Sequence, residues 1–129
     1  MELTREHCRP VSSPSEAQIV RALSLMKSSY CALSAETGAY IQVAGGPGLF
    51  FVERHDVDGQ HHRASQPSSM VPFPDGTTLS FSAGTIALAS TEWLLANQVK
   101  ELLIAFLAGE AFPSWVQWSP SVAVFGSAD

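Results

Sequence analysis

A chain of 129 residues has the length of one domain and can bury a core without a structural metal or disulfide bonds. Hydrophobic residues make up 46% and charged residues 15%, which excludes a disordered chain. The formal net charge of −5 argues against nucleic acid as a direct partner, because phosphate binding needs clustered Lys and Arg; it suits a basic partner, although mild acidity also serves solubility.

The first predicted element is a helix. Residues 1–12 are polar and are expected to be frayed. Ser13-Pro14-Ser15-Glu16 predicts a helix start, with serine at the cap, proline at the first helical position and glutamate closing a capping box. The helix is expected to continue to about Lys27, with an inner face that comprises Ile19, Val20, Leu23 and Met26.

Four strands are predicted next, as an antiparallel meander over 30–35, 39–44, 49–55 and 60–64. Glycine-containing turns separate them, and the last turn is Asp58-Gly59. The fourth strand is much less apolar than the other three, so we expect it at the exposed edge of the sheet. A proline-rich loop over 66–74 then precedes a strand at 77–81, and 85–88 is either another short strand or the approach to the long helix.

A long amphipathic helix is predicted to begin at Ser90 or Thr91, either of which can cap it. It is expected to end at Gly109, and Pro113 prevents it from resuming. A strand at 115–118 then returns to the sheet, with an apolar tail at 122–125 that can dock as another strand.

The predicted fold is α+β: an antiparallel meander sheet, an N-terminal helix and a longer C-terminal helix packed on it, and a closing short strand. We expect one domain over 1–129, loose at 1–12 and 126–129.

The C-terminal pattern resembles that of a known family. A helix that ends in a glycine, followed by a P-x-x-V-x-W strand, is similar to small immunity proteins of bacterial polymorphic toxin systems. A glycine-rich hairpin at 40–46 and a strand at 49–53 fit the same pattern, and the resemblance covers roughly the last two thirds of the chain. The matching residues are Phe106, Gly109, Pro113, Val116 and Trp118. The resemblance implies a compact, non-enzymatic α+β protein that neutralises a secreted deaminase or nuclease toxin.

The densest set of polar groups is the hairpin at 53–63. His55, His61 or His62 could combine with a nearby aspartate as metal ligands. Adjacent His61 and His62 point to opposite faces of a strand, however, so only one can meet a ligand on the neighbouring strand. We therefore expect a solvated hairpin tip and no metal.

Catalytic and cofactor-binding patterns are also missing from the sequence. No G-x-S-x-G elbow is present, and Gly45-Gly46-Pro47-Gly48 lacks the Lys and Ser or Thr of a phosphate-binding loop. Cys8 and Cys31 are too few and too far apart for a recognisable zinc site. The chain starts without an apolar secretory segment and has no run that could span a bilayer. We expect a cytoplasmic, non-enzymatic protein with free thiols, no cofactor and no membrane or nucleic-acid partner.

The expected partner is a cognate protein toxin with a basic active-site groove. Trp115 and Trp118 face opposite sides of the predicted strand, so Trp118 is expected in the core and Trp115 at an interface. The expected core residues are Leu95, Val99, Leu102, Phe106 and Trp118. The expected toxin-interface residues are Glu53, His55, Asp56, Asp58, His61, Asp75 and Trp115. The alternative is a small ligand-binding or scaffolding domain that acts as a homodimer.

Overall fold

The computed structural model describes residues 1–121, so the expected apolar tail at 122–125 and the expected loose end at 126–129 lie outside the described residues. The strands are β1 (Glu2–Arg5), β2 (Val11–Ser12), β3 (Ser29–Ser34), β4 (Tyr40–Gly45), β5 (Leu49–His55), β6 (His61–Ser65), β7 (Thr77–Phe81), β8 (Gly84–Leu88), β9 (Leu94–Leu95) and β10 (Gln117–Ser121). The helices are α1 (Glu16–Ser24) and α2 (Ala96–Ala108), with a 3-10 turn η1 (Ser90–Glu92). The predicted α+β class, with a mostly antiparallel sheet and two helices, is confirmed.

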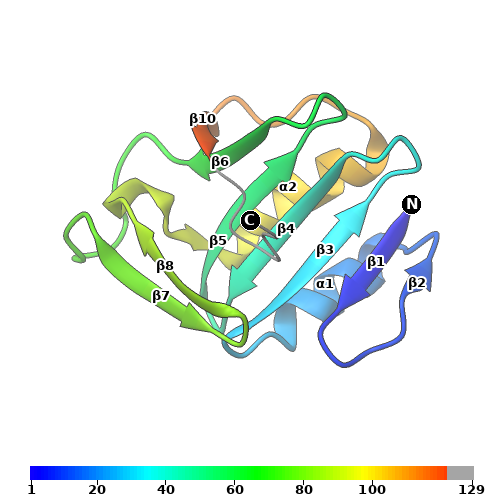
Figure 1. Ribbon diagram of the computed structural model, residues 1–129, viewed down its shortest axis with the longest axis horizontal. Coiled ribbons are helices and arrows are strands. Elements are labelled where there is room, and N and C mark those ends of the chain that lie inside the picture. Colours follow the sequence, from blue (N-terminus) through cyan, green and yellow to red (C-terminus); the bar gives the residue numbers. More distant parts are fainter. Residues whose placement is uncertain (122–129) are drawn as a thin grey trace.

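One sheet dominates the described part of the chain. Its strand order is β10-β6-β5-β4-β3-β1-β2, and β9 pairs with the start of β5. Both helices lie on the same face of this sheet, and β7 and β8 form a separate two-stranded sheet (Figure 1). Because β10 pairs with β6, the fourth strand of the meander is not at the exposed edge, contrary to our expectation.

The N-terminal segment also differs from the expectation. Residues 1–12 supply β1 and β2, and β1 pairs with β3. Leu3 lies opposite Leu33 in that pairing and is 2% exposed, so a single buried leucine draws a polar segment into the sheet.

The capping signals of both helices lie later in the chain than predicted. At α1 the capping box joins Ser15 to Gln18, two residues beyond the predicted one. At α2, Leu95 occupies the N-cap position and its N–H donates to Gln98 Oε1. The helix cannot start at Ser90 because Leu94 and Leu95 are extended and pair with β5. Its predicted end at Gly109 is confirmed, with φ +69°.

Two apolar clusters lie on the two faces of the sheet. The larger one packs both helices against β1, β3, β4 and β5. Within it Val99 and Leu102 are fully buried, as predicted, while Phe106 and Trp118 are half-buried at its margin. Leu95 is half-buried on β9 rather than on the helix. The smaller cluster packs the β7–β8 hairpin and Trp93 against Phe51 on the other face.

Candidate functional site

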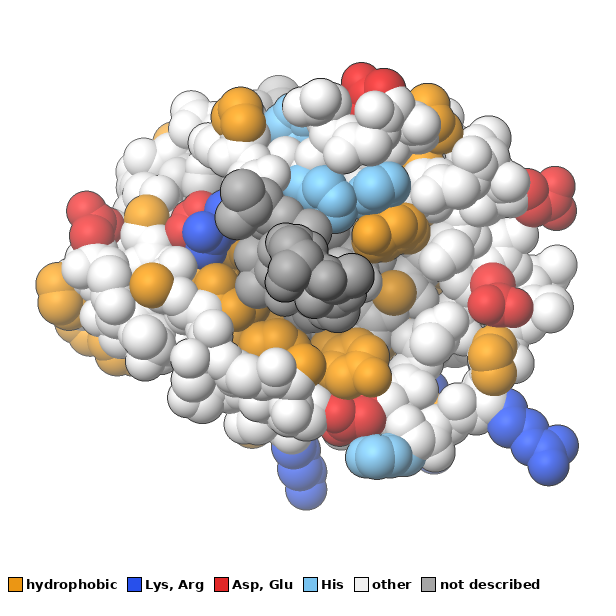
Figure 2. Space-filling view, viewed as in Figure 1, with side chains coloured by type: hydrophobic (Ala, Val, Ile, Leu, Met, Phe, Trp, Pro, Cys, Tyr) orange, Lys and Arg blue, Asp and Glu red, His pale blue; other side chains and the backbone are white. Residues whose placement is uncertain are grey.

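A row of polar side chains crosses four strands on the face of the sheet away from the helices. The strand register places Tyr40 opposite His55, His55 opposite His61, and His61 opposite Ser121. Residues that pair directly across two strands have their side chains on the same face of the sheet. Along β5, alternate residues also share a face, so Phe51 and Glu53 lie on the same face as His55. Figure 2 looks onto this face and shows histidine side chains gathered on it.

The members of this row contact one another. The rings of Tyr40 and His55 stack, with centroids 4.5 Å apart and planes 5° from parallel. His55 Nδ1 and His61 Nε2 share a hydrogen bond of 2.9 Å. The other ring nitrogen of His61, Nδ1, lies 3.6 Å from Glu53 Oε1. We call Glu53, His61 and His55 the relay, because their polar atoms lie next to one another in that order; His55 and His61 share a hydrogen bond, whereas the approach of Glu53 to His61 is longer than one.

The carboxylate at the start of the relay is deeply buried. Glu53 is 1% exposed, and its second oxygen, Oε2, accepts a hydrogen bond of 3.2 Å from Ser121 Oγ. A buried carboxylate requires such partners, because its charge is costly to remove from water. Burial raises the pKa of Tyr40, and the charge of Glu53 raises it further, so the phenol at the other end of the row stays protonated at neutral pH.

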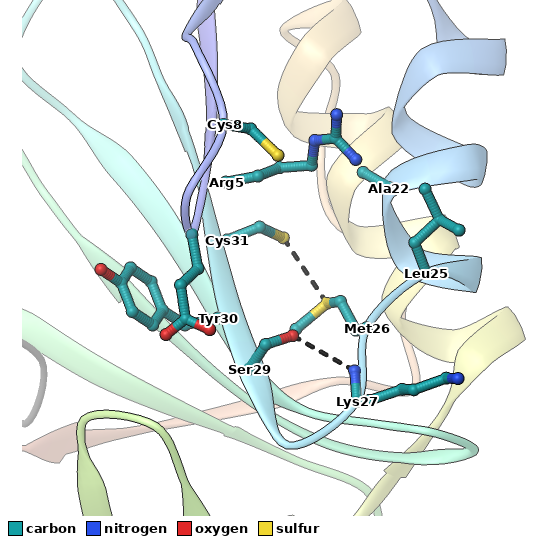
Figure 3. A pocket seen from close by; sticks show the side chains of 10 residues that line it. Arg5, Cys8, Ala22, Leu25, Met26, Lys27, Ser29, Tyr30 and Cys31 are labelled. Carbon is teal, nitrogen blue, oxygen red and sulfur yellow. Dashed lines mark hydrogen bonds between the residues drawn. The ribbon is translucent and has the colours of Figure 1, made fainter.

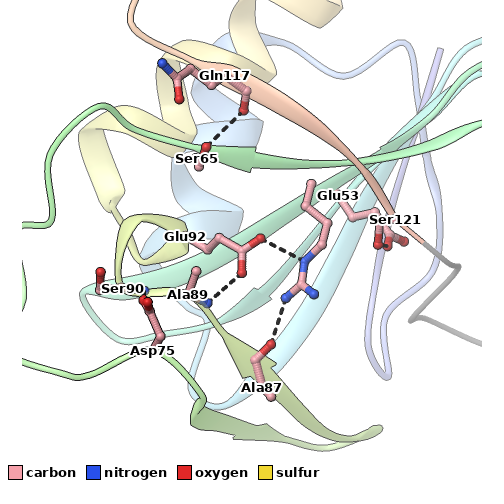
Figure 4. A network of polar contacts seen from close by, with 10 residues as sticks. Glu53, Ser65, Asp75, Ala87, Ala89, Ser90, Glu92, Gln117 and Ser121 are labelled. Atoms are coloured by element: carbon pink, nitrogen blue, oxygen red, sulfur yellow. Dashed lines mark hydrogen bonds and ion pairs between the residues drawn. The ribbon is translucent and has the colours of Figure 1, made fainter.

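Arg63 connects this face to the β7–β8 hairpin. Its Nε lies 3.0 Å from Glu92 Oε2, and its Nη2 donates to the carbonyl of Ala87 at 2.9 Å. Figure 4 shows Glu92 and Ala87 around this contact, with Glu92 also accepting from the N–H of Ala89. The guanidinium lies over the Phe51 ring, 4.6 Å from its centroid. Glu92 lies in η1, before the long helix, and its carboxylate pairs with Arg63.

The next histidine belongs to a different cluster. His62 points to the helix side of the sheet, where its Nδ1 lies 3.2 Å from Asp56 Oδ2. Arg54 shares that aspartate, with Nε 3.3 Å from Oδ1, and its guanidinium lies over the rings of Trp118 and Phe112. The prediction that His61 and His62 face opposite sides is therefore confirmed.

The tip of the β5–β6 hairpin is tightly ordered. Asp56 N–H donates to the Gln60 carbonyl, Gly59 N–H donates to the Asp56 carbonyl, and Gln60 N–H donates to Asp58 Oδ1, at 2.9 to 3.0 Å. Val57 is 68% exposed between the two aspartates. The tip thus presents an apolar side chain flanked by carboxylates.

The predicted interface residues do not form one surface. The structure brings Glu53, His55 and His61 together in the relay, and puts Asp56 and Asp58 at the hairpin tip. Asp75 instead accepts a hydrogen bond of 2.7 Å from the N–H of Ser90. Trp115 lies outside β10, half-buried against the core, and its indole N–H donates to Glu101 at 2.9 Å.

The predicted site residues did not include Tyr40, Arg54, Arg63 or Ser121, although Arg54 and Arg63 lie within the polar hairpin at 53–63. Tyr40 could have been found, because the turn at 46–48 pairs β4 with β5 and counting outward from it brings Tyr40 opposite His55. Ser121 carries no such local signal, since its pairing with β6 joins distant parts of the chain.

A separate hollow of about 310 Å³ lies between α1, β1 and β3. Arg5, Cys8, Met26, Lys27 and Cys31 are among the residues that line it (Figure 3). The Cys31 thiol points to Met26, with the sulfur atoms 3.8 Å apart. Burial raises the pKa of Cys31 to about 12, against a smaller opposing effect of Arg5, so this thiol is not a nucleophile at neutral pH.

Across the described part of the chain, no three side chains of His, Cys, Asp or Glu are positioned to hold a metal ion together. Neither helix in residues 1–121 combines the length and apolar character that crossing a bilayer requires. No protein-family model matches the chain, and no curated protein is significantly similar to it in sequence.

Proposed function

We propose that this protein is an immunity protein that binds a cognate secreted or contact-delivered bacterial toxin, of the deaminase or nuclease class, and occludes its active site. It acts in the cytoplasm of the producing cell. The C-terminal resemblance described above and the net charge of −5 support this proposal. The observation that carries it is the β5–β6 hairpin tip.

The tip has the composition of a contact for a basic protein surface. Val57 is 68% exposed, so its apolar side chain can fill a pocket of a partner. Asp56 shares its charge with Arg54 and His62, so its field is partly neutralised. Among residues 1–121, Asp58 accepts a hydrogen bond from the N–H of Gln60 and forms no ion pair, so it is the outward charge of the tip.

The fixed conformation of the hairpin tip favours tight binding of a partner. Three hydrogen bonds fix the turn in the free protein, so little conformational entropy is lost when a partner binds. A carboxylate on a fixed hairpin can enter a groove that binds phosphate groups and can speed association with it.

The test begins with the product of the adjacent reading frame, co-expressed with this protein and co-purified. We expect a stable complex and inhibition of the toxin. Val57→Asp should weaken binding about tenfold or more, because it puts a third carboxylate where an apolar contact is expected. Asp58→Asn retains the hydrogen bond to Gln60 and should slow association at low salt more than at high salt.

Glu2→Gln is the matched control for Asp58→Asn. It removes the same charge from an exposed side chain on β1, three strands from β5 in the sheet order. We expect wild-type affinity from it. A neighbouring gene product that neither binds the wild-type protein nor harms the cell would rule the proposal out.

A further inference from the structure

The β7–β8 hairpin forms a sheet of only two strands. Its inner side chains, among them Leu79 and Ile86, belong to the smaller apolar cluster. The N–H of Ser82, in the hairpin loop, donates to the carbonyl of Ser28 at 2.9 Å, which fixes the loop to the start of β3. The hairpin is thus held in place from one side, yet a two-stranded ribbon is marginal by itself and gains stability from further strands.

The hydrogen-bond pattern of the hairpin determines which backbone groups of β7 point away from β8. Hydrogen bonds alternate along an antiparallel pair, and a two-residue loop closes a hairpin on a hydrogen-bonded pair, which here is Phe81 with Gly84. Counting back from that pair, Leu79 also bonds to β8, whereas Thr78 and Ser80 direct their N–H and C=O groups outward. The outer edge of β7 therefore presents the backbone donors and acceptors of two residues.

Two carbonyl groups of β8 support this assignment. That of Leu88 accepts from the N–H of Gly76 at 2.8 Å, so it points to the β7 side of the hairpin. That of Ala87 accepts from Arg63 Nη2 at 2.9 Å, so it points to the β6 side. Neighbouring carbonyls thus point in opposite directions, as the alternation requires. The outer edge of β8 faces Arg63, and the open edge of the hairpin is that of β7.

This edge of β7 is uncovered in the part of the chain that the structure describes. The strand pairs with β8 alone, and within residues 1–121 the outward backbone groups of Thr78 and Ser80 make no hydrogen bond. Both side chains are exposed, and Figure 1 shows β7 at the margin of the molecule with β8 on its inner side. Proteins commonly block such edges with a charge or a proline, and β7 has neither, so it can accept another strand.

The charge of this region indicates which partner it suits. Residues 76–91 contain no Asp, Glu, Lys, Arg or His, although the chain has a net charge of −5. A basic toxin is attracted by carboxylates, which this edge lacks. Two copies of an acidic chain repel each other, and the repulsion is smallest where the surfaces in contact are neutral. A second copy of this chain is therefore the better fit.

We propose that β7 pairs with β7 of a second copy, antiparallel about a two-fold axis at Leu79, so that two hairpins join into a four-stranded sheet. The outward N–H and C=O groups of Thr78 then bond to those of Ser80 in the other copy, and the axis repeats this contact. Leu79 lies beside its own counterpart, which extends the smaller apolar cluster from one copy to the other. Each threonine faces a serine across the two strands, a favourable pair.

The pairing closes at a dimer. A contact of a surface with itself uses the open edge of both copies, and the outer edge of β8 faces Arg63 of the same chain. The dimer goes beyond the proposed function and does not depend on it. It leaves the β5–β6 hairpin tip accessible, because Figure 1 shows that tip at the opposite margin of the molecule from β7.

The first test needs only the wild-type protein. The contact is smaller than a standard interface, so sedimentation equilibrium from about 1 to about 500 µM should show a monomer–dimer equilibrium with a Kd of about 10 µM. Amide hydrogen exchange of Thr78 and Ser80 should slow as the concentration rises, whereas that of Leu79, which already bonds to β8, should not change. A monomer throughout this range would overturn the inference, as would exchange at Thr78 and Ser80 that is equally fast in the dimer.

The second test uses charge to probe the register. Thr78→Lys with Ser80→Lys puts like charges directly opposite each other across the axis and should raise the Kd about tenfold or more. Thr78→Lys with Ser80→Glu puts opposite charges there and should restore the dimer. Thr85→Lys with Ala87→Lys is the matched control, since it adds the same charge at exposed positions of β8, away from the proposed contact, and should keep the wild-type Kd.

Two results with these variants would contradict the pairing: a double-lysine variant of β7 that dimerises like the wild type, or a lysine–glutamate variant that dimerises no better than the double-lysine one. Binding to the product of the adjacent reading frame is measured separately. A dimer that binds no toxin contradicts the proposed function alone. A monomeric wild-type protein in which only the toxin slows exchange at Thr78 and Ser80 would assign this edge to the toxin and overturn the dimer.

Discussion

The guanidinium of Arg54 lies over the indole of Trp118, its central carbon 4.5 Å from the ring centroid, and so joins β5 to β10. The same central carbon lies 5.4 Å from the centroid of the Phe112 ring, and Arg54 Nε lies 3.3 Å from Asp56 Oδ1 in an ion pair. The tryptophan that resembles the family pattern is therefore a platform for an arginine at the base of the hairpin, as well as a residue at the margin of the core.

Arg54→Met should keep the packing of the aliphatic stem and lose the contacts with the aromatic rings and with Asp56. We expect unfolding in urea to show a loss of about 1 kcal/mol, since the arginine is partly exposed. Arg9→Met is the control, because Arg9 is exposed. Equal stability of the two variants would show that the ring contacts contribute nothing.

Substitution of Gly46 tests whether the β4–β5 turn has room for a side chain. Its φ is +88°, and a Cβ there would overlap the carbonyl of Met26, coming within 2.8 Å of its carbon atom. Gly38 has a similar φ of +97° but open space around it. Gly38→Ala should therefore cost about 1 kcal/mol from backbone strain alone, and Gly46→Ala clearly more. Urea unfolding of both variants measures the difference in their free energies of unfolding. Similar losses in the two variants would mean that the backbone around Met26 shifts to accommodate the added methyl group.

The two cysteines should differ in reactivity. With its pKa raised to about 12, Cys31 has a thiolate fraction of only about one in ten thousand at pH 8, and it is 1% exposed, whereas Cys8 is exposed. A thiol reagent at that pH should modify one thiol of the native protein and two in denaturant. Cys8→Ser should abolish the native reaction and Cys31→Ala should leave it. Rapid modification of native Cys8→Ser would refute this assignment.

The raised pKa of Tyr40 should make the free energy of unfolding fall at alkaline pH. Its pKa is raised in the folded protein by burial and by Glu53, above the usual 10.0. The unfolded chain then releases the phenolic proton at a lower pH than the folded protein does, so stability falls as the pH rises above about 10. Tyr40→Phe should reduce that fall, and Tyr30→Phe is the matched control. Urea unfolding across this pH range measures it, and identical slopes for the two variants would disprove it.

Asp75 should matter for stability rather than for partner binding. Its carboxylate accepts a hydrogen bond of 2.7 Å from the N–H of Ser90, which fixes the loop before β7 to the start of η1. Asp75→Ala should lower the unfolding free energy by about 1 kcal/mol, and Asp75→Asn, which keeps an acceptor, by less. If Asp75→Ala instead weakened toxin binding as Val57→Asp is expected to, Asp75 would belong to the interface.

Local sequence signals predicted the central hairpins well. Glycine-bearing turns and strand alternation suffice to put β3, β4, β5 and β6 in an antiparallel meander, and the two-residue period puts His61 and His62 on opposite faces. The end of α2 was also predictable, because Gly109 adopts the left-handed conformation that an α-helix stop favours.

Other features depend on segments that are far apart in the chain. Ser90 has the residue type of a helix cap, yet the helix starts at Ala96 because Leu94 and Leu95 gain more by pairing with β5. Similarly, Glu92 has the position of a first-turn acid, but Arg63 draws it to the sheet. Local propensity yields in both cases to a tertiary contact that burial strengthens.

By itself, then, the sequence determined the α+β class, the hairpins and the face of each strand residue, because turn geometry and the alternation of side chains act over a few residues. Tertiary structure alone decided which groups meet: Ser121 reaches Glu53 across 68 residues, and Glu53, His61 and His55 come to lie side by side. Such contacts depend on long-range strand pairing, which no local pattern encodes.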